Sequence, residues 1–375
     1  MNKKEVSEIR KVMTPDDPYC TLNNIGIVIV DAENCIHMAK RQSGALLTDR
    51  ETDVYYKILK GIISTKLCKK FIEYDFPDTA YTDEGAVSVL FKLSNQGILS
   101  DDDICDFGGY VSENLCYPGP YALVVGHFTY AVRHRNAAGS IEKFSSEDYN
   151  FIVSAICPVV FVDSGFAYDF SSDRLTTATD SHLYVKPVPT DGFLFPAFNS
   201  RTPDVNSVMY YTSKPDSCNS SLIADVLGCD VKMCATTEAE MFKNVLKTAF
   251  GDDLDYQLLY LLNERFNEIY DNFKEDTKPV MVGVKEIANA LTSIGCGSDF
   301  VTKFENIYNA MIGTDLHLIN LIDNKIKMQT SEYTVTFNTA VGGAKVHLGV
   351  VNGGKTINLS TDDSNVEVNG IPIDK

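Results

Sequence analysis

Hydrophobic and polar positions follow three different patterns along the chain. Up to about residue 213, segments with helical spacing are interleaved with alternating segments that are typical of strands. From about residue 214, apolar residues recur at helical spacing, and the last 62 or so residues return to short alternating runs. We therefore predict an α+β domain over residues 1–213, a helical region over 214–313 and a small β module over 314–375.

The first part mixes helices with strands. Thr48-Asp49 has the composition of a helix cap, and Thr82-Asp83 is expected to open a further helix. Long strands then follow one another without intervening helices, which favours antiparallel pairing and an α+β fold over a doubly wound sheet. The expected helices cover about 2–13 and 50–65, and the expected strands cover 25–30, 35–40, 71–76, 121–135 and 149–162, with extended chain from 166 to 211.

The helical region has recognisable starts and stops. Thr237 to Glu240 fits a capping box, and Gly295 and Gly313 are placed to end helices. The helix pair over 283–312 has the outline of a helix-turn-helix, but its second helix offers Asp299, Lys303 and Glu305, which suit DNA poorly. An ordinary αα-hairpin is the better interpretation.

The β module has two hairpin signals, at Asn352-Gly353-Gly354 and at Asn369-Gly370, because Asn and Gly tolerate the positive φ of tight turns. A strand is expected over 333–337. Such a short tail is marginal alone, so it is expected to need the helices, whereas a chain that ends at Gly313 is expected to stay soluble.

The charge of the chain restricts its partners. It has 51 acidic and 33 basic residues, a formal net charge of −18. An acidic surface repels phosphate backbones and anionic membranes, so we expect neither nucleic acid nor a membrane as partner. The need for solubility is enough to explain such a charge. The more specific alternative is that the acidic surface binds a basic protein partner.

The start of the chain and the lack of a long apolar run indicate a cytoplasmic protein, for which ten cysteines are many. Residues 1–11 are charged where a signal peptide would be apolar, and the apolar run 151–162 is too short to span a bilayer. None of the ten cysteines forms a CxxC pair or a zinc-ligand pattern with histidine. We expect free thiols and no metal site.

No common catalytic signature is present. The sequence has no dinucleotide or phosphate-binding glycine motif, no HExxH, no GxSxG and no EF-hand loop. No cofactor is therefore expected. An enzyme whose residues converge only in three dimensions stays open.

One candidate site lies on the expected strand 121–135. Alternation places His127, Arg133 and Arg135 on one face with Thr129, where a cationic stripe has the charge to hold an anion. The alternative is a solvated sheet face.

A second candidate is the segment 192–204, which has a polar tip formed by Asn199, Arg201 and Asp204. The alternative is a structural crossing in which the phenylalanines fill the core and Arg201 pairs with Asp204. Cys157 is a third candidate, as a nucleophile, but its apolar neighbours favour a buried, inert thiol.

Several segments together resemble a known family. They are Met1 to Lys11, Ser154 to Val159, Gly192 to Asn199, Met209 to Thr212, Leu227-Gly228-Cys229, Gly251-Asp252-Asp253 and Val366 to Ile371. In this order they resemble a bacterial family catalogued as domain of unknown function number 4317, found mainly in Firmicutes. The resemblance implies a bacterial cytoplasmic protein and brings no known catalytic residues.

These observations favour a non-enzymatic binding or regulatory protein. The alternative is an enzyme of unrecognised type that acts on an anionic small molecule near His127 and Arg133. A pocket on which polar side chains converge would discriminate between the two hypotheses.

Overall fold

The computed structural model describes two compact units. Unit 1 comprises Met1–Thr236 together with Glu275–Pro279, and unit 2 comprises Thr237–Lys274 together with Val280–Lys375. The division into three parts at 213 and 313 stays a prediction. The residues described are 1–375 except 84, 136–140, 146, 163–165, 170–173, 178–181, 274–278, 340–344, 352–353, 361–366, 369–370 and 373–375.

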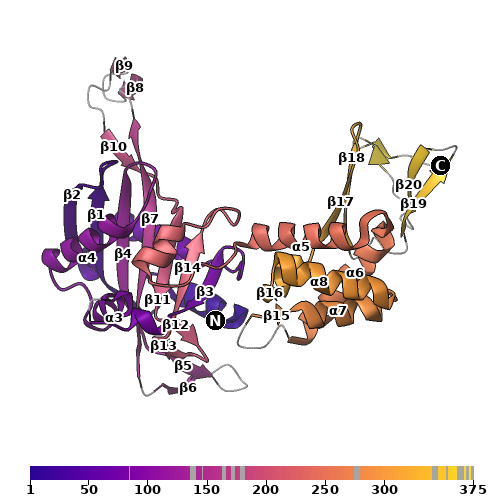
Figure 1. Cartoon of the computed structure of the whole chain (residues 1–375). Helices are drawn as coiled ribbons and strands as arrows, with labels where there is room; N and C mark the ends of the chain where they lie inside the picture. Colours follow the sequence, from indigo (N-terminus) through magenta and orange to yellow (C-terminus); the bar gives the residue numbers. More distant parts are fainter. Residues whose placement is uncertain are drawn as a thin grey trace. The chain divides into compact units, whose positions relative to one another are not determined.

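Unit 1 is built on one antiparallel sheet, so the predicted α+β class is confirmed (Figure 1). All neighbours within this sheet pair antiparallel. In order across the sheet the strands are β2 (Ile36–Ser43), β1 (Cys20–Val30), β4 (Tyr121–Tyr130), β7 (Tyr149–Val162), β11 (Asp191–Phe195), β14 (Ser207–Thr212) and β3 (Phe71–Asp75), and β10 (His182–Val185) also pairs with β7.

Helices cover both faces of the sheet, because the strands carry apolar side chains on both sides and these have to be buried. Successive side chains of β4 alternate between two hydrophobic clusters, one with Ala122 and Val124 and the other with Leu123 and Val125. The first face is covered by α1 (Lys3–Val12) and α2 (Asp49–Ile62), and the second by α3 (Ala86–Gln96), α4 (Asp101–Asn114) and a π-helical turn, η3 (Leu222–Val226).

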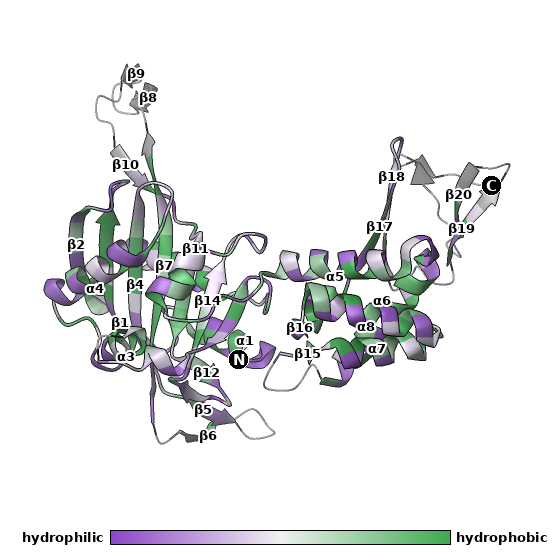
Figure 2. Cartoon of the chain, in the orientation of Figure 1, coloured by the Kyte–Doolittle hydropathy of each residue, from purple (hydrophilic) through white to green (hydrophobic). Residues whose placement is uncertain are grey.

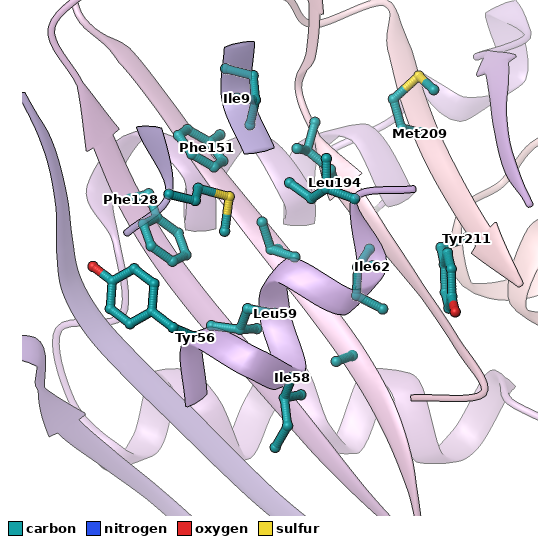
Figure 3. Close-up of a cluster of buried hydrophobic side chains, with 14 of the residues drawn as sticks. Ile9, Tyr56, Ile58, Leu59, Ile62, Phe128, Phe151, Leu194, Met209 and Tyr211 are labelled. Carbon is teal, nitrogen blue, oxygen red and sulfur yellow. The ribbon is translucent and has the colours of Figure 1, made fainter. Parts of the chain in front are cut away.

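The first face has an aromatic and aliphatic core, which Figure 3 shows in part. The rings of Phe128 and Phe151 stack with centroids 5.2 Å apart, and Tyr56 meets Phe128 edge-on at 5.9 Å. Leu59 and Ile62 of α2 are fully buried against these strands. Figure 2 shows hydrophobic residues in β4 and β7 and a mixture of hydrophobic and hydrophilic residues in the helices.

Two glycines let α4 lie close to the sheet. A Cβ at Gly108 would stand 2.9 Å from the methyl groups of Val28, and a Cβ at Gly26 would overlap the side chain of Ile104. Each glycine therefore leaves room for a side chain of the opposite element, Gly108 for Val28 and Gly26 for Ile104. The sequence pattern did not predict α4.

Three helices of unit 1 begin with a reciprocal capping box. The pairs are Asn2 with Glu5, Thr48 with Glu51, and Ser100 with Asp103. In each pair the first side chain accepts a backbone N–H bond that the helix leaves unsatisfied, and the second returns the contact.

Short strand pairs extend from the sheet. The pair β12–β13 turns at Ser200 and Arg201, whose φ values of 52° and 59° are both positive, as a tight hairpin requires. These pairs are β5 (Arg133–Arg135) with β6 (Ile141–Phe144), β8 (Phe166–Asp169) with β9 (Arg174–Thr177), and β12 (Ala197–Asn199) with β13 (Thr202–Asp204); the 3-10 turns are η1 (Gly44–Leu46) and η2 (Asp78–Ala80).

Unit 2 packs helices around a small core. Phe242 and Phe304 are almost fully buried, as are Leu316, Leu318 and Leu321 beyond the last long helix. Its elements are α5 (Ala235–Phe250), η4 (Gly251–Asp253), α6 (Tyr256–Phe273), β15 (Met281–Val282), α7 (Val284–Ser293), α8 (Ser298–Met311), β16 (Leu316–His317), α9 (Leu318–Leu321), β17 (Lys325–Gln329), β18 (Thr334–Asn338), β19 (Val346–Val351), β20 (Gly354–Leu359), β21 (Glu367–Val368) and β22 (Ile371–Pro372).

Several predicted boundaries are wrong for local reasons. The expected strand 121–135 ends at Tyr130, and β5 starts a separate strand pair at Arg133. The helix expected at Thr82-Asp83 starts after Gly85, and α5 starts at Ala235, which places the predicted cap Thr237 inside the helix.

Other predicted boundaries are confirmed. Gly295 and Gly313 follow the ends of α7 and α8 with φ values of 95° and 68°, as expected of glycines that end helices. The hairpin signals at Asn352-Gly353 and Asn369-Gly370 lie outside the described residues. No helix within the described part of the chain is long and apolar enough to cross a membrane.

Candidate functional site

His127 is a buried structural group on the face of the sheet that α3 covers. Its Nε2 lies 2.9 Å from the carbonyl oxygen of Ser94, and its Nδ1 lies 3.2 Å from the side-chain nitrogen of Asn23. Burial lowers the pKa of His127, so the neutral ring donates from Nε2 and accepts at Nδ1. Both ring nitrogens are therefore engaged.

Arg133 lies on the side of α1, away from His127. Its guanidinium stands 4.6 Å from the ring centroid of Tyr19 and 5.9 Å from that of Tyr130, and Nη2 lies 3.2 Å from an oxygen of Asp17. The structure therefore does not bring His127 and Arg133 together. Arg135 ends β5, and its side chain lies outside the described residues.

Arg201 connects the β12–β13 hairpin to α1. Its Nε and Nη2 donate to the two carboxylate oxygens of Glu8 at 2.9 and 2.6 Å, and Nη2 also donates to the carbonyl oxygen of Arg133. Tyr130 donates to the same carboxylate at 2.8 Å. The interpretation that Arg201 pairs with Asp204 is wrong, because the tight turn directs the guanidinium to Glu8.

Asn199 and Asp204 do lie together. The amide of Asn199 donates to Asp204 at 2.8 Å and to Glu73 at 2.5 Å, and Glu73 also holds the amino group of Met1. These contacts connect the hairpin to β3. A binding role for the six candidate residues stays a prediction.

The neighbouring phenylalanines and Cys157 fill the core, as the structural alternatives predicted. Phe193, Phe195 and Phe198 are at most 1% exposed. Cys157 is fully buried, and burial raises the pKa of its thiol to about 12, so the thiol stays protonated.

A pocket of about 380 Å³ opens in unit 2 between α5, α6 and β17. Its floor contains Phe242 and Leu246 from α5 and Leu262 and Phe266 from α6, all of them buried. Leu321 is a further buried apolar residue of its lining. The pocket therefore has an apolar base.

Four exposed lysines line this pocket, which we call the lysine-rimmed pocket. Lys243 and Lys247 lie one turn apart on α5, and Lys325 and Lys327 alternate along β17. The acidic residue in the lining is Asp323, whose carboxylate lies 3.4 Å from Nζ of Lys243. Four cations against one anion leave a local charge of +3 on a chain whose formal net charge is −18.

Asn263 fixes the segment that carries the second pair of lysines. Its side-chain nitrogen donates to the carbonyl oxygen of Asp323 at 3.1 Å, and its side-chain oxygen accepts the N–H of Asp323 at 2.8 Å. Asn263 is itself 8% exposed. This two-way contact holds the start of β17 against α6, so the rim is preorganised.

Glu238 and His317 form a buried polar contact elsewhere in unit 2. The Nδ1 of His317 lies 2.9 Å from one carboxylate oxygen of Glu238, and Asn320 donates to the other at 2.7 Å. The pair connects α5 to β16 and α9. Within the described residues, no cluster of three or more histidine, cysteine or acidic side chains is arranged to hold a metal ion.

A second hollow lies in unit 1, between α2 and the outer strands. It measures about 530 Å³ and is largely apolar, with Ile27, Ile29 and Val54 in its lining. Its charged residues are Arg50 and Glu51, and Glu51 already caps α2. This hollow offers apolar area but no surplus of charge.

The fold and the pocket define an α+β protein with a helical unit that carries a cationic, apolar-based pocket. The family described as Domain of unknown function (DUF4317) matches residues 1–371, and the chain belongs to this family. Comparison with curated proteins finds no match.

Proposed function

We propose that the chain is a non-enzymatic binding protein of the bacterial cytoplasm, and that its lysine-rimmed pocket holds a small amphipathic anion. The observation that carries the proposal is the union of an apolar base with four lysines in a chain of net charge −18. A volume of about 380 Å³ falls in the range of small-molecule sites.

The charge of the rim favours an anionic ligand. Among the residues that the structure describes, Lys247, Lys325 and Lys327 have no acidic partner, so their charges are available to a ligand. An ammonium group is a point charge without the planar fork of arginine. The rim therefore suits a carboxylate, a phosphate or a sulfonate alike.

The base of the pocket favours a ligand with an apolar body. Phe242, Leu246 and Phe266 are each at most 4% exposed, whereas Leu259 at the opening is 43% exposed. A ligand that covers Leu259 removes apolar area from water, which is favourable at roughly 25 cal/mol per Å². An acyl chain or an aromatic ring meets this requirement.

A fluorescence titration with anilinonaphthalene sulfonate tests the proposal, because this probe combines aromatic rings with an anionic group. We expect saturable binding and displacement by decanoate. Decyltrimethylammonium, which has the same tail and the opposite charge, is expected not to displace the probe, and neither is duplex DNA. Equal displacement by both decyl compounds would contradict the anionic specificity.

Charge-removing variants locate the site. Lys325→Gln with Lys327→Gln is expected to weaken decanoate binding about tenfold, since two exposed charges contribute about 1.4 kcal/mol together. The matched control is Lys285→Gln with Lys303→Gln, which removes the same charge from α7 and α8. If both double variants lose the same affinity for decanoate, the effect comes from the net charge of the protein and not from the pocket.

A second matched pair separates the two hollows. Leu259→Asp places a carboxylate at the lysine-rimmed pocket, and Val54→Asp does so at the apolar hollow of unit 1. The two side chains are 43% and 42% exposed, so both substitutions should be tolerated. We expect only Leu259→Asp to abolish binding, and loss through Val54→Asp would assign the ligand to unit 1.

A further inference from the structure

The hairpin of β17 and β18 has one apolar face. In the register of the two strands, Ile326 lies opposite Phe337. Two residues further along β17, Met328 lies opposite Val335. Directly opposed residues of an antiparallel pair point to the same side, so these four side chains form one strip, which we call the hairpin strip. All four are partly exposed, whereas the other face of the hairpin carries lysine, glutamine, threonine and asparagine.

The hairpin strip continues the lysine-rimmed pocket. Ile326 belongs to the strip and also lines the pocket. Lys325 and Lys327 point to the opposite face of β17 and line the pocket as well. The pocket therefore reaches both faces of β17 at the start of the strand. Its lysines are available to a charged group, and the strip leads away from the pocket toward Met328 and Val335.

The hairpin strip is apolar surface that the hairpin does not cover by itself. Within the part of the chain that the structure describes, β17 and β18 pair with each other and with no further strand. A two-stranded hairpin is marginally stable in water unless something packs on its apolar face. A ligand that lies on the strip would bury apolar area and order the hairpin at the same time.

We propose that the ligand of the lysine-rimmed pocket is a long-chain fatty acid, whose carboxylate meets the lysines and whose tail leaves the pocket along the hairpin strip. This inference rests on the proposed function and narrows its ligand class. Two kinds of apolar body suit the base of the pocket, an acyl chain and an aromatic ring. A flexible chain can follow both the pocket and the strip, whereas a compact ring stays in the pocket.

The dependence of affinity on chain length tests the proposal. Isothermal titration calorimetry of the full-length protein compares decanoate with tetradecanoate. A fully buried methylene tightens binding about fourfold, and an open face covers about half of each methylene. Four further methylenes should therefore tighten binding about tenfold or more. Equal affinity for the two fatty acids would overturn the proposal.

Two double variants locate the path of the tail. Met328→Gln with Val335→Gln makes the far end of the strip polar and keeps Ile326 at the pocket. Tetradecanoate should then bind no more tightly than decanoate, while the affinity for decanoate stays within about twofold. The matched control is Thr334→Gln with Thr336→Gln, which alters the polar face of the same hairpin and should keep the gain. A gain that survives in the first variant, or that both variants lose, contradicts this path.

Hydrogen exchange of the unmodified protein gives a second measurement that does not depend on how a variant folds. At equal saturation, tetradecanoate should protect the amides of β17 and β18 more strongly than decanoate does, because its tail covers the hairpin. Equal protection would overturn the proposal. A failure of decanoate to bind would refute the proposed function together with this inference. Normal binding of decanoate without a gain for tetradecanoate would refute this inference alone.

Discussion

Unit 1 and unit 2 use charged side chains in different ways. In unit 1, Arg201 is neutralised by Glu8, and Asn199 is held by Glu73 and Asp204. In unit 2, Lys325 and Lys327 have no acidic partner among the described residues. Arg201 and Asn199, two of the candidate residues predicted from the sequence, are thus engaged in contacts within unit 1. The better candidate for binding is the lysine-rimmed pocket, in which Lys247, Lys325 and Lys327 have no acidic partner among the described residues.

The largest expected effect tests whether unit 2 depends on residues beyond Gly313. Leu316 and Leu318 are fully buried, and His317 pairs with the buried Glu238. A chain that ends at Gly313 should therefore lose the cooperative melting of unit 2, which replaces our expectation from the sequence. Calorimetry should show the transition of unit 1 alone.

The matched control is a chain that ends at Asn324. It keeps the contacts of Leu316, His317 and Leu318 but lacks β17. It should melt cooperatively in both units and bind decanoate at least about tenfold more weakly, because Lys325, Lys327 and the lining residue Ile326 are gone. Two normal transitions in the chain that ends at Gly313 would contradict the shared core.

A smaller effect tests whether the units unfold independently. Phe198 in unit 1 and Phe304 in unit 2 are both fully buried. Replacing either by alanine should cost about 3–5 kcal/mol, since it removes a ring and leaves a cavity. We expect Phe198→Ala to lower only the melting temperature of unit 1 and Phe304→Ala only that of unit 2. If each variant lowers both transitions equally, the units unfold as one.

A third comparison concerns Arg201, which is paired with Glu8, and Lys327, which has no acidic partner among the described residues. Arg201→Gln removes two charged hydrogen bonds to Glu8 and should lower the free energy of unfolding by about 1–2 kcal/mol, since the pair is partly exposed. Lys327→Gln should change it by less than about 0.5 kcal/mol. Urea denaturation measures both. If Arg201→Gln and Lys327→Gln lower the free energy of unfolding equally, the two units do not differ in how far their charged side chains stabilise the fold.

The smallest expected effect concerns Asp191, which is 8% exposed and accepts a hydrogen bond from Tyr210 at 2.7 Å. Burial raises the pKa of Asp191, so the folded protein holds this proton more tightly than the unfolded chain, where the pKa is about 3.9. The stability contribution is fully present below the unfolded pKa and is lost as pH rises through the raised folded pKa.

Asp191→Asn should therefore remove this pH dependence and raise the stability of unit 1 at neutral pH, because the amide oxygen can still accept from Tyr210. Urea denaturation across the acidic range measures the change. Asp299→Asn, an exposed position in unit 2, is the control and should have no such effect. A destabilised Asp191→Asn at neutral pH would show that the ionised form is preferred.

Elements with strong local signals could be predicted from the sequence. The strand expected over 149–162 is β7 with the same bounds, and the helix that Gly295 was expected to end is α7. Two elements with mixed signals were missed. The helix α4 opens with three aspartates and contains Gly108 and Gly109, and β17 alternates lysine with apolar residues without a turn signal.

The candidate site could not be predicted because it depends on tertiary structure. Lys243 and Lys325 are far apart in the sequence but line the same pocket, where Asn263 holds the start of β17 against α6. Conversely, His127 and Arg133 were expected on one face, but the strand ends between them. A break of two residues was enough to separate them.

The close approach of α4 to the sheet has an evolutionary consequence. Since a side chain at Gly26 would occupy the space of Ile104, the two positions share one fixed volume. Relatives that carry alanine at position 26 should carry valine or alanine at position 104, and neither change should be accepted first without a loss of fitness. Positions 26 and 104 should therefore covary within the family. This covariation would identify the contact that sets the distance between α4 and the sheet.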